Sequence, residues 1–282
     1  MNEFVPTLVE TEWLSSVLDD SSIRVVDATW HLPTTDRNGI DDYRNGHIPG
    51  AVFWNIDAVA DPSSDLPHMI PDEAEFERHM TELGIGSEHH VVVYDAVNMM
   101  TAPRVWWTLR TFGHDRVSIL DGGLTKWVVE DRALSSAEAK IQDVSFKAHF
   151  NPEMIRSLQA VRNISDTNSA LLLDARSPGR FKGIEPEPRP NCRPGHIPGS
   201  KNLSFTNLIN PETGTLKPVA EIKTLIDEFG VDPDKPVVTT CGSGITACVL
   251  ALGLHITGFT DVAVYDGSWT EWGSRTDTPV EK

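Results

Sequence analysis

The chain contains few cysteines and no long apolar segment. Three cysteines occur in 282 residues, at Cys192, Cys241 and Cys248. An odd and sparse set of this kind excludes a disulfide framework. Because no Cys-x-x-Cys or paired Cys/His spacing is present, the sequence predicts neither a zinc site nor any other metal or cofactor. No apolar run approaches the roughly 18 residues that a membrane-spanning helix needs, so no membrane partner is expected.

Basic residues are also scarce. The chain has 24 Lys and Arg against 41 Asp and Glu, which gives a formal net charge of −17. A balance this acidic excludes nucleic acid as an expected partner, and an anionic substrate then needs a local cluster of positive groups. The first twenty residues carry five acidic and no basic side chains, unlike secretory or transit peptides, so the sequence predicts a cytoplasmic protein.

Several short stretches of the sequence occur twice. The matching pairs are residues 23–28 and 171–176, 47–51 and 196–200, 91–95 and 237–240, 101–102 and 246–247, and 121–123 and 266–268. Such self-similarity indicates a duplicated domain. We therefore predict a first domain over 1–135, a linker over 136–154 and a second domain over 155–282.

Short apolar runs alternate with helix-like segments in both halves. The predicted strands are 23–27, 91–95, 117–120, 170–174, 237–240 and 262–265, and the predicted helices are 73–83, 102–112, 219–229 and 246–255. Fully apolar strands separated by helices favour a parallel sheet covered on both faces. The predicted fold class is α/β, with two tandem domains that each contain a mainly parallel sheet.

One cysteine stands at a position suited to chemistry. Cys241 ends the β-branched run Val-Val-Thr-Thr and is followed by Gly-Ser-Gly-Ile-Thr and then by a helical pattern. Glycines allow successive N–H groups to turn toward one point, and a helix N-terminus adds its own unpaired N–H groups and the positive end of its dipole. A thiol at such a place is expected to be a good nucleophile. The alternative is a buried structural cysteine, which does not need a turn of inward-facing amides.

The first half of the chain has no cysteine in the corresponding loop. An ungapped alignment, in which Thr101 matches Thr246 at an offset of 145 residues, places Ala96 opposite Cys241. We therefore expect the first domain to be a structural partner that forms one wall of the site, since ligands often bind between domains.

The paired His-Ile-Pro-Gly runs, the paired Asp-Gly-Gly/Ser segments and the single cysteine loop resemble the tandem-domain rhodanese superfamily over nearly the whole chain. Within it, the run from Cys241 to Thr246 is similar to that of the 3-mercaptopyruvate sulfurtransferases, with Ile245 in place of the usual Val. Thiosulfate sulfurtransferases typically carry basic residues where Gly242 and Ser243 stand. The resemblance implies two rhodanese-like domains and a sulfur-transfer activity.

A second segment, residues 179–189, resembles the substrate loop of the same enzymes. The resemblance implies that Arg180 and Arg189 hold the carboxylate and carbonyl oxygens of mercaptopyruvate. Independently, an arginine presents a planar, permanently charged fork that suits a carboxylate. The alternative is that both are solvated loop arginines.

The resemblance also implies a mechanism. The Cys241 thiolate takes sulfur from 3-mercaptopyruvate, releases pyruvate and holds the sulfur as a persulfide, which a thiol, cyanide or a thioredoxin-like protein then accepts. The expected anion-binding residues are Gly242, Gly244, Ile245 and Thr246. Ser243 either relays a proton or completes the turn. His47 either assists through Ser243 or bonds a loop carbonyl, and Trp30 either walls the pocket or belongs to the core.

Three rival functions use related loops. A thiosulfate sulfurtransferase shares the cysteine and the intermediate, and a non-catalytic persulfide carrier shares the cysteine alone; both stay open. A phosphatase of related architecture needs an arginine at the sixth position after the cysteine. Ala247 stands there, which argues against the phosphatase.

Overall fold

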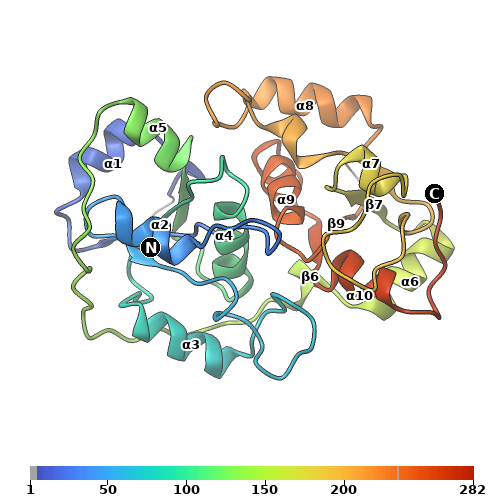
Figure 1. Ribbon diagram of the computed structural model, residues 1–282, viewed down its shortest axis with the longest axis horizontal. Helices are drawn as coiled ribbons and strands as arrows, with labels where there is room; N and C mark the ends of the chain where they lie inside the picture. The colour runs from blue at the N-terminus through green and yellow to red at the C-terminus, as the bar shows by residue number, and fades with distance from the viewer. Residues whose placement is uncertain (1–4, 234) are drawn as a thin grey trace. The chain divides into compact units, whose positions relative to one another are not determined.

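The computed structural model describes residues 5–233 and 235–282, which form two compact units (Figure 1). The first unit comprises the chain up to Pro62 together with Ile70–Asn151 and Asn210–Leu216. The second comprises Ser63–Met69, Pro152–Ile209 and Lys217–Lys282. Each unit therefore includes a short segment that belongs, by position in the chain, with the other.

The first unit is built on a five-stranded parallel sheet with the order β1-β5-β4-β2-β3. Its strands are β1 (Leu8–Val9), β2 (Ile23–Asp27), β3 (Val52–Phe53), β4 (His90–Tyr94) and β5 (Val117–Leu120). Its helices are α1 (Thr11–Val17), α2 (Gly39–Asn45), α3 (Glu73–Glu82), α4 (Ala102–Thr111) and α5 (Gly123–Val129).

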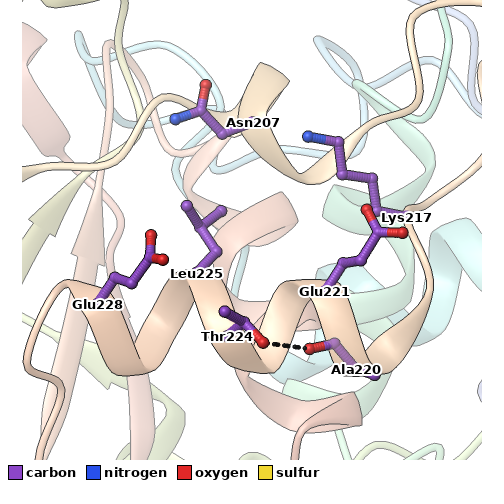
Figure 2. Close-up of a pocket in the computed structure, with 7 residues that line it drawn as sticks. All are labelled: Asn207, Lys217, Ala220, Glu221, Thr224, Leu225 and Glu228. Carbon is purple, nitrogen blue, oxygen red and sulfur yellow. Dashed lines mark hydrogen bonds between the residues drawn. The ribbon is translucent and has the colours of Figure 1, made fainter.

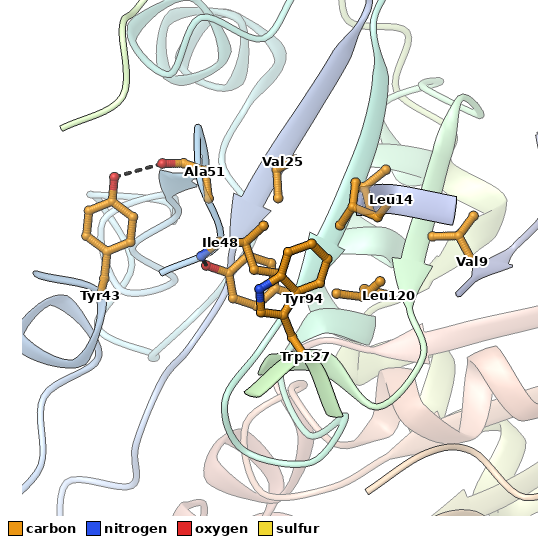
Figure 3. Close-up of a cluster of buried hydrophobic side chains, with 10 residues drawn as sticks. Val9, Leu14, Val25, Tyr43, Ile48, Ala51, Tyr94, Leu120 and Trp127 are labelled. Carbon is orange, nitrogen blue, oxygen red and sulfur yellow. Dashed lines mark hydrogen bonds between the residues drawn. The ribbon is translucent and has the colours of Figure 1, made fainter. Parts of the chain in front are cut away.

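One face of this sheet packs against a cluster of buried side chains (Figure 3). Val25 and Val92 of the central strands meet Leu14 of α1 and Trp127 of α5. The Tyr94 hydroxyl accepts a hydrogen bond from the Ile48 N–H at 3.1 Å, so the aromatic ring also ties a loop to the core. The opposite face is covered by α4, and both faces are therefore buried, as fully apolar strands require.

The second unit repeats this arrangement, with the strand order β6-β10-β9-β7-β8 and parallel pairing throughout. Its strands are β6 (Ile155–Arg156), β7 (Leu171–Asp174), β8 (Lys201–Asn202), β9 (Val237–Thr240) and β10 (Val262–Tyr265). Its α-helices are α6 (Leu158–Thr167), α7 (Pro178–Phe181), α8 (Val219–Glu228), α9 (Ala247–Ile256) and α10 (Ser268–Ser274), and two 3-10 turns are η1 (Pro152–Met154) and η2 (Phe205–Leu208).

The predicted fold class is confirmed in both units, and every predicted strand and helix lies within a few residues of an observed one. The strands that the sequence did not predict are the two-residue strands β1, β3, β6 and β8. They lie at the outer positions of the sheets, and two residues are too few to show a period.

The predicted linker, 136–154, contains no helix or strand before the 3-10 turn η1. Part of it packs against the first unit. Phe146 is buried, and the N–H groups of His149 and Asn151 donate to the carbonyls of Phe112 and Thr111 at 2.9 and 2.8 Å. This stretch is consequently an irregular strap on the first unit over most of its length.

Candidate active site

Cys241 follows directly after β9, the central strand of the second sheet, and is 2% exposed. The loop from Cys241 to Thr246 is held from the side of α10. The Ser268 hydroxyl accepts from the N–H groups of Cys241 and Gly244, both at 3.1 Å, and donates to the Tyr265 carbonyl at 2.7 Å. The Trp269 N–H donates to the Cys241 carbonyl at 3.0 Å. The loop is thus fixed at both ends of its turn.

The remaining amides of this loop are available as donors. Gly244 has φ +79°, a left-handed conformation that glycine adopts without strain and that reverses the chain here. Five N–H groups between positions 242 and 247, all but that of Gly244, have no hydrogen-bond acceptor among the described residues. They belong to Gly242, Ser243, Ile245, Thr246 and Ala247. Helix α9 begins at Ala247, so the last of these amides also belong to a helix N-terminus.

The sheet registers identify the counterpart of Cys241 in the first unit. Asp27 pairs with Tyr94, and Asp174 pairs with Thr240, so the residue after Tyr94 corresponds to the residue after Thr240. That residue is Asp95, and the ungapped alignment that placed Ala96 opposite Cys241 is wrong. The reason is that the first loop, 95–101, is one residue longer than the second, 241–246.

Asp95 shows what a loop of this kind can hold. Its carboxylate accepts four backbone hydrogen bonds at 2.7–3.0 Å, from Val97, Met99, Thr101 and Ala102. Asp95 is 1% exposed, so the main-chain amides take the place of water around the negative charge. In the first unit the strand–loop–helix turn therefore stabilises a buried anion with its backbone.

Ser243 meets a histidine that the sequence analysis did not single out. His68 Nδ1 lies 3.1 Å from Ser243 Oγ and 3.3 Å from the Ser243 carbonyl oxygen. Both side chains are almost fully buried. His68 has φ +64° in an irregular segment that packs with the second unit, so no periodic or spacing signal marks it in the sequence.

Arg180 lies beside the cysteine loop. A Cβ built on Gly242 would lie 3.0 Å from Arg180 Nη2, so the guanidinium lies close beside this glycine and a larger residue there would displace it slightly. Arg180 also binds Glu187, with Nη2 2.5 Å from Oε2 and Nε 3.3 Å from Oε1. The structure thus brings one of the two predicted arginines next to Gly242.

Glu187 joins Arg180 to a fully buried arginine. Arg176 Nη1 donates to Glu187 Oε1 at 2.8 Å, and its other nitrogens bind the Asp174 carboxylate at 2.6–3.1 Å. Burial of the Arg176 guanidinium opposes its charge, but Asp174 and Glu187 outweigh that effect and raise its pKa. Two arginines and two carboxylates therefore form one continuous network behind the cysteine loop.

Arg189, the second predicted substrate ligand, lies partly exposed in the same loop. Its charge acts on Cys192. Burial raises the pKa of the Cys192 thiol and Glu187 raises it further, while Arg189, Arg176 and Arg180 oppose the increase. Arg189 and Glu187 therefore both lie within electrostatic range of Cys192.

His47 and Trp30 make their recorded contacts within the first unit. His47 is fully buried, its Nδ1 lies 2.7 Å from the Tyr43 carbonyl oxygen, and its Nε2 lies 3.1 Å from that of Ala137. Trp30 donates from Nε1 to Asp57 at 2.9 Å. The two ring nitrogens of His47 thus face backbone carbonyls, that of Tyr43 in α2 and that of Ala137 in the linker, and the second contact matches the structural alternative that the sequence left open.

A separate hollow lies on the second unit between η2 and α8 (Figure 2). Its charged side chains are Lys217, Glu221 and Glu228, so carboxylates outnumber the single ammonium group. The hollow is consequently a poor site for an anionic substrate. Among residues 5–233 and 235–282, no three His, Cys, Asp or Glu side chains are grouped as the ligands of a metal ion would be. No helix in that part of the chain is long and apolar enough to cross a bilayer.

The rhodanese-like domain model matches the sequence twice, over residues 10–130 and 157–275, which together make up most of the chain. The chain belongs to the rhodanese-like domain family. A relative within the family, the 3-mercaptopyruvate sulfurtransferase of Escherichia coli (strain K12), is 44% identical over 274 residues that cover 97% of each chain. The "Thiosulfate/3-mercaptopyruvate sulfurtransferase 1, mitochondrial" of Arabidopsis thaliana is 39% identical over 97% of this chain and 78% of its own.

A solved rhodanese structure agrees with these relatives. The E. coli 3-mercaptopyruvate sulfotransferase SseA is similar with a TM-score of 0.86 and 41% sequence identity, covering 94% of this chain and 99% of that one. This chain therefore shares both its sequence family and its fold with proteins named for sulfur transfer.

Proposed function

We propose that this rhodanese-family protein is a 3-mercaptopyruvate sulfurtransferase that works through a persulfide on Cys241. The observation that carries the proposal is the row of N–H groups that follows Cys241 without acceptors among the described residues. The same turn in the first unit holds the Asp95 carboxylate with four amides. A thiolate or a persulfide anion on Cys241 has the corresponding need for donors.

The first half-reaction moves one sulfur atom. The Cys241 thiolate attacks the sulfur of 3-mercaptopyruvate and forms an S–S bond while the carbon–sulfur bond of the substrate breaks. The bonding electron pair of that carbon–sulfur bond passes to carbon and gives the enolate of pyruvate, which a proton converts to pyruvate. Cys241 keeps the transferred sulfur as a persulfide, so a difficult transfer is divided into two steps.

The side chains around the loop fit this step. Arg180, beside Gly242, supplies a planar cationic fork for the substrate carboxylate, and we propose that Arg189 shares that task. Ser243 has a hydroxyl within hydrogen-bond distance of His68, so a proton can pass between substrate, hydroxyl and imidazole. For Ser243, the His68 contact supports the relay, the first of the two roles that the sequence left open.

In the second half-reaction an acceptor attacks the outer sulfur of the persulfide, and the Cys241 thiolate leaves. A thiol, cyanide and a thioredoxin-like protein all have the nucleophilic chemistry for this step, and the acceptor stays a prediction. A cytoplasmic location also stays a prediction, since the Arabidopsis relative is named as mitochondrial. We propose further that residues 155–282 carry the catalytic cysteine, that 1–135 serve mainly as structural support and that 136–154 connect them.

Measuring both donors side by side tests the function. The wild-type protein should release pyruvate from 3-mercaptopyruvate faster than it forms sulfite from thiosulfate, and mass spectrometry should find one added sulfur atom on the peptide with Cys241. Cys241→Ser should lose both signals, whereas the matched control Cys192→Ser should keep them. A clear preference for thiosulfate would favour the rival donor, and no added sulfur with either donor would contradict the enzyme assignment.

A further inference from the structure

The carboxylate of Glu187 is buried between two arginines. Its side chain is 5% exposed, against 22% for the side chain of Arg180, which it binds, and 0% for that of Arg176. Arg176 contacts only one oxygen of Glu187, Oε1, at 2.8 Å, whereas Arg180 reaches both oxygens. Glu187 therefore connects a completely buried cation to a partly accessible one.

The buried end of this connection is rigid. Arg176 binds both carboxylate oxygens of Asp174, donates from Nη2 to the Gly195 carbonyl at 2.9 Å, and lies with its guanidinium carbon 4.4 Å from the centroid of the Trp269 ring. Since a guanidinium with this many partners cannot rotate without losing several of them, it fixes the position of Glu187. Glu187 in turn fixes Arg180.

Glu187 binds only one edge of the Arg180 guanidinium and leaves another edge for a ligand. Glu187 takes the side edge, formed by the Nε and Nη2 hydrogens. A guanidinium has five N–H donors, so Nη1 and the second hydrogen of Nη2 remain for another carboxylate. Arg180 Nη2, which is part of this end edge, lies beside Gly242 in the loop that carries Cys241.

The charges of the network also cancel. Arg176 and Arg180 contribute two positive charges, and Asp174 and Glu187 contribute two negative ones. A substrate with one carboxylate then gains two directed hydrogen bonds from Arg180, and its binding costs the desolvation free energy of only one charge. A dianion such as thiosulfate has a larger desolvation cost and finds little uncompensated positive charge in the network.

We propose that Glu187 is the positioning residue that sets donor specificity: it turns the end edge of Arg180 toward the donor and cancels its charge, so that a monocarboxylate thiol is preferred to dianionic thiosulfate. This inference rests on the proposed function and adds to it a reason for the choice between the two donors. Glu187 itself acts through Arg180.

Glu187→Gln tests the proposal, because it removes the charge and keeps the shape. We expect the ratio of kcat/KM for 3-mercaptopyruvate to that for thiosulfate to fall by about tenfold or more, with a lower KM for thiosulfate. The matched control is Glu185→Gln in the same loop. Glu185 is exposed and bonds the Ser177 hydroxyl at 2.6 Å, so its loss changes the net charge equally and should leave the ratio as in the wild type.

Glu187→Asp separates position from charge. It keeps the carboxylate but shortens its reach, so Arg180 should lose its orientation; the KM for 3-mercaptopyruvate should rise with no gain in thiosulfate use. This variant also provides a test if Glu187→Gln does not fold. An unchanged donor ratio in a folded Glu187→Gln protein, or a gain in thiosulfate use by Glu187→Asp, would overturn the inference. Wild-type protein that releases no pyruvate would instead overturn the proposed function.

Discussion

His68 Nδ1 lies 3.1 Å from Ser243 Oγ, although 175 residues separate the two in the sequence. The histidine is held in a left-handed backbone conformation within the segment Ser63–Met69, and its ring is buried. A non-glycine residue in that conformation carries a strain that surrounding contacts must offset. This pairing places an imidazole that can exchange a proton with the Ser243 hydroxyl in the loop that carries Cys241.

Replacing His68 tests this partnership. His68→Asn should lower the kcat for pyruvate release by about 10²-fold, because general acid–base groups contribute on that scale, with little change in KM. The pH profile of kcat should also lose the limb that the wild type owes to the imidazole. His79→Asn, on the surface helix α3, is the control and should behave as the wild type. Unchanged kcat and pH profile in His68→Asn would show that the histidine only supports the loop.

The two arginines of the substrate loop make a second prediction. Arg180→Lys and Arg189→Lys keep the charge but remove the planar fork, and each should lower kcat/KM for 3-mercaptopyruvate by about 5- to 150-fold, equivalent to about 1–3 kcal/mol. Steady-state kinetics measure the loss. Lys182→Ala, an exposed change in the same loop, should leave kcat/KM unaltered. If both Lys variants retain full activity, the substrate-loop assignment is wrong.

The first unit should depend on Asp95 for stability. Asp95→Ala leaves four N–H groups without their acceptor, three of them buried and that of Val97 partly buried, and should lower the free energy of unfolding by about 3 kcal/mol or more. Urea unfolding followed by tryptophan fluorescence reports the change. Ala96→Ser, at the neighbouring position, should be nearly neutral. Equal effects of the two substitutions would contradict the equivalence of Asp95 and Cys241.

Acid should destabilise the first unit through His114. Burial lowers the pKa of His114 to about 4, from an ordinary value near 6.5. Between those pH values the unfolded chain binds a proton that the folded chain does not, so stability falls as the pH decreases through this window, by up to about 3 kcal/mol. In His114→Gln, the slope of the unfolding free energy against pH should be shallower between pH 6.5 and 4. Superimposable slopes would refute the assignment.

The sequence predicted those parts of the molecule whose side chains repeat with a regular period. The apolar runs of the central strands, the helix after Thr246 and the cysteine turn between them all lie where they were expected. Arg180, whose loop matches a known motif, lies beside Gly242, and its role in substrate binding stays a prediction. Local pattern was sufficient for these because neighbouring residues determine them.

Long-range contacts were not accessible in this way. Nothing near His68 in the sequence indicates that its ring reaches Ser243, and the pairing of Ser268 with the Cys241 and Gly244 amides depends on where α10 begins. The mismatch of Ala96 with Asp95 has a different cause. A single extra residue in an irregular loop leaves the flanking strand and helix intact, so it is invisible until the strand registers are known.

The segment that carries His68 has a consequence for the duplication itself. By its order in the gene this imidazole belongs to the copy that lacks a reactive sulfur, yet its contact is with the copy that has one. A polypeptide that began after residue 154 would contain Cys241 and Ser243 and would lack their histidine. If sulfur transfer requires that imidazole, deleting the first repeat would remove a group that takes part in the reaction as well as structural support.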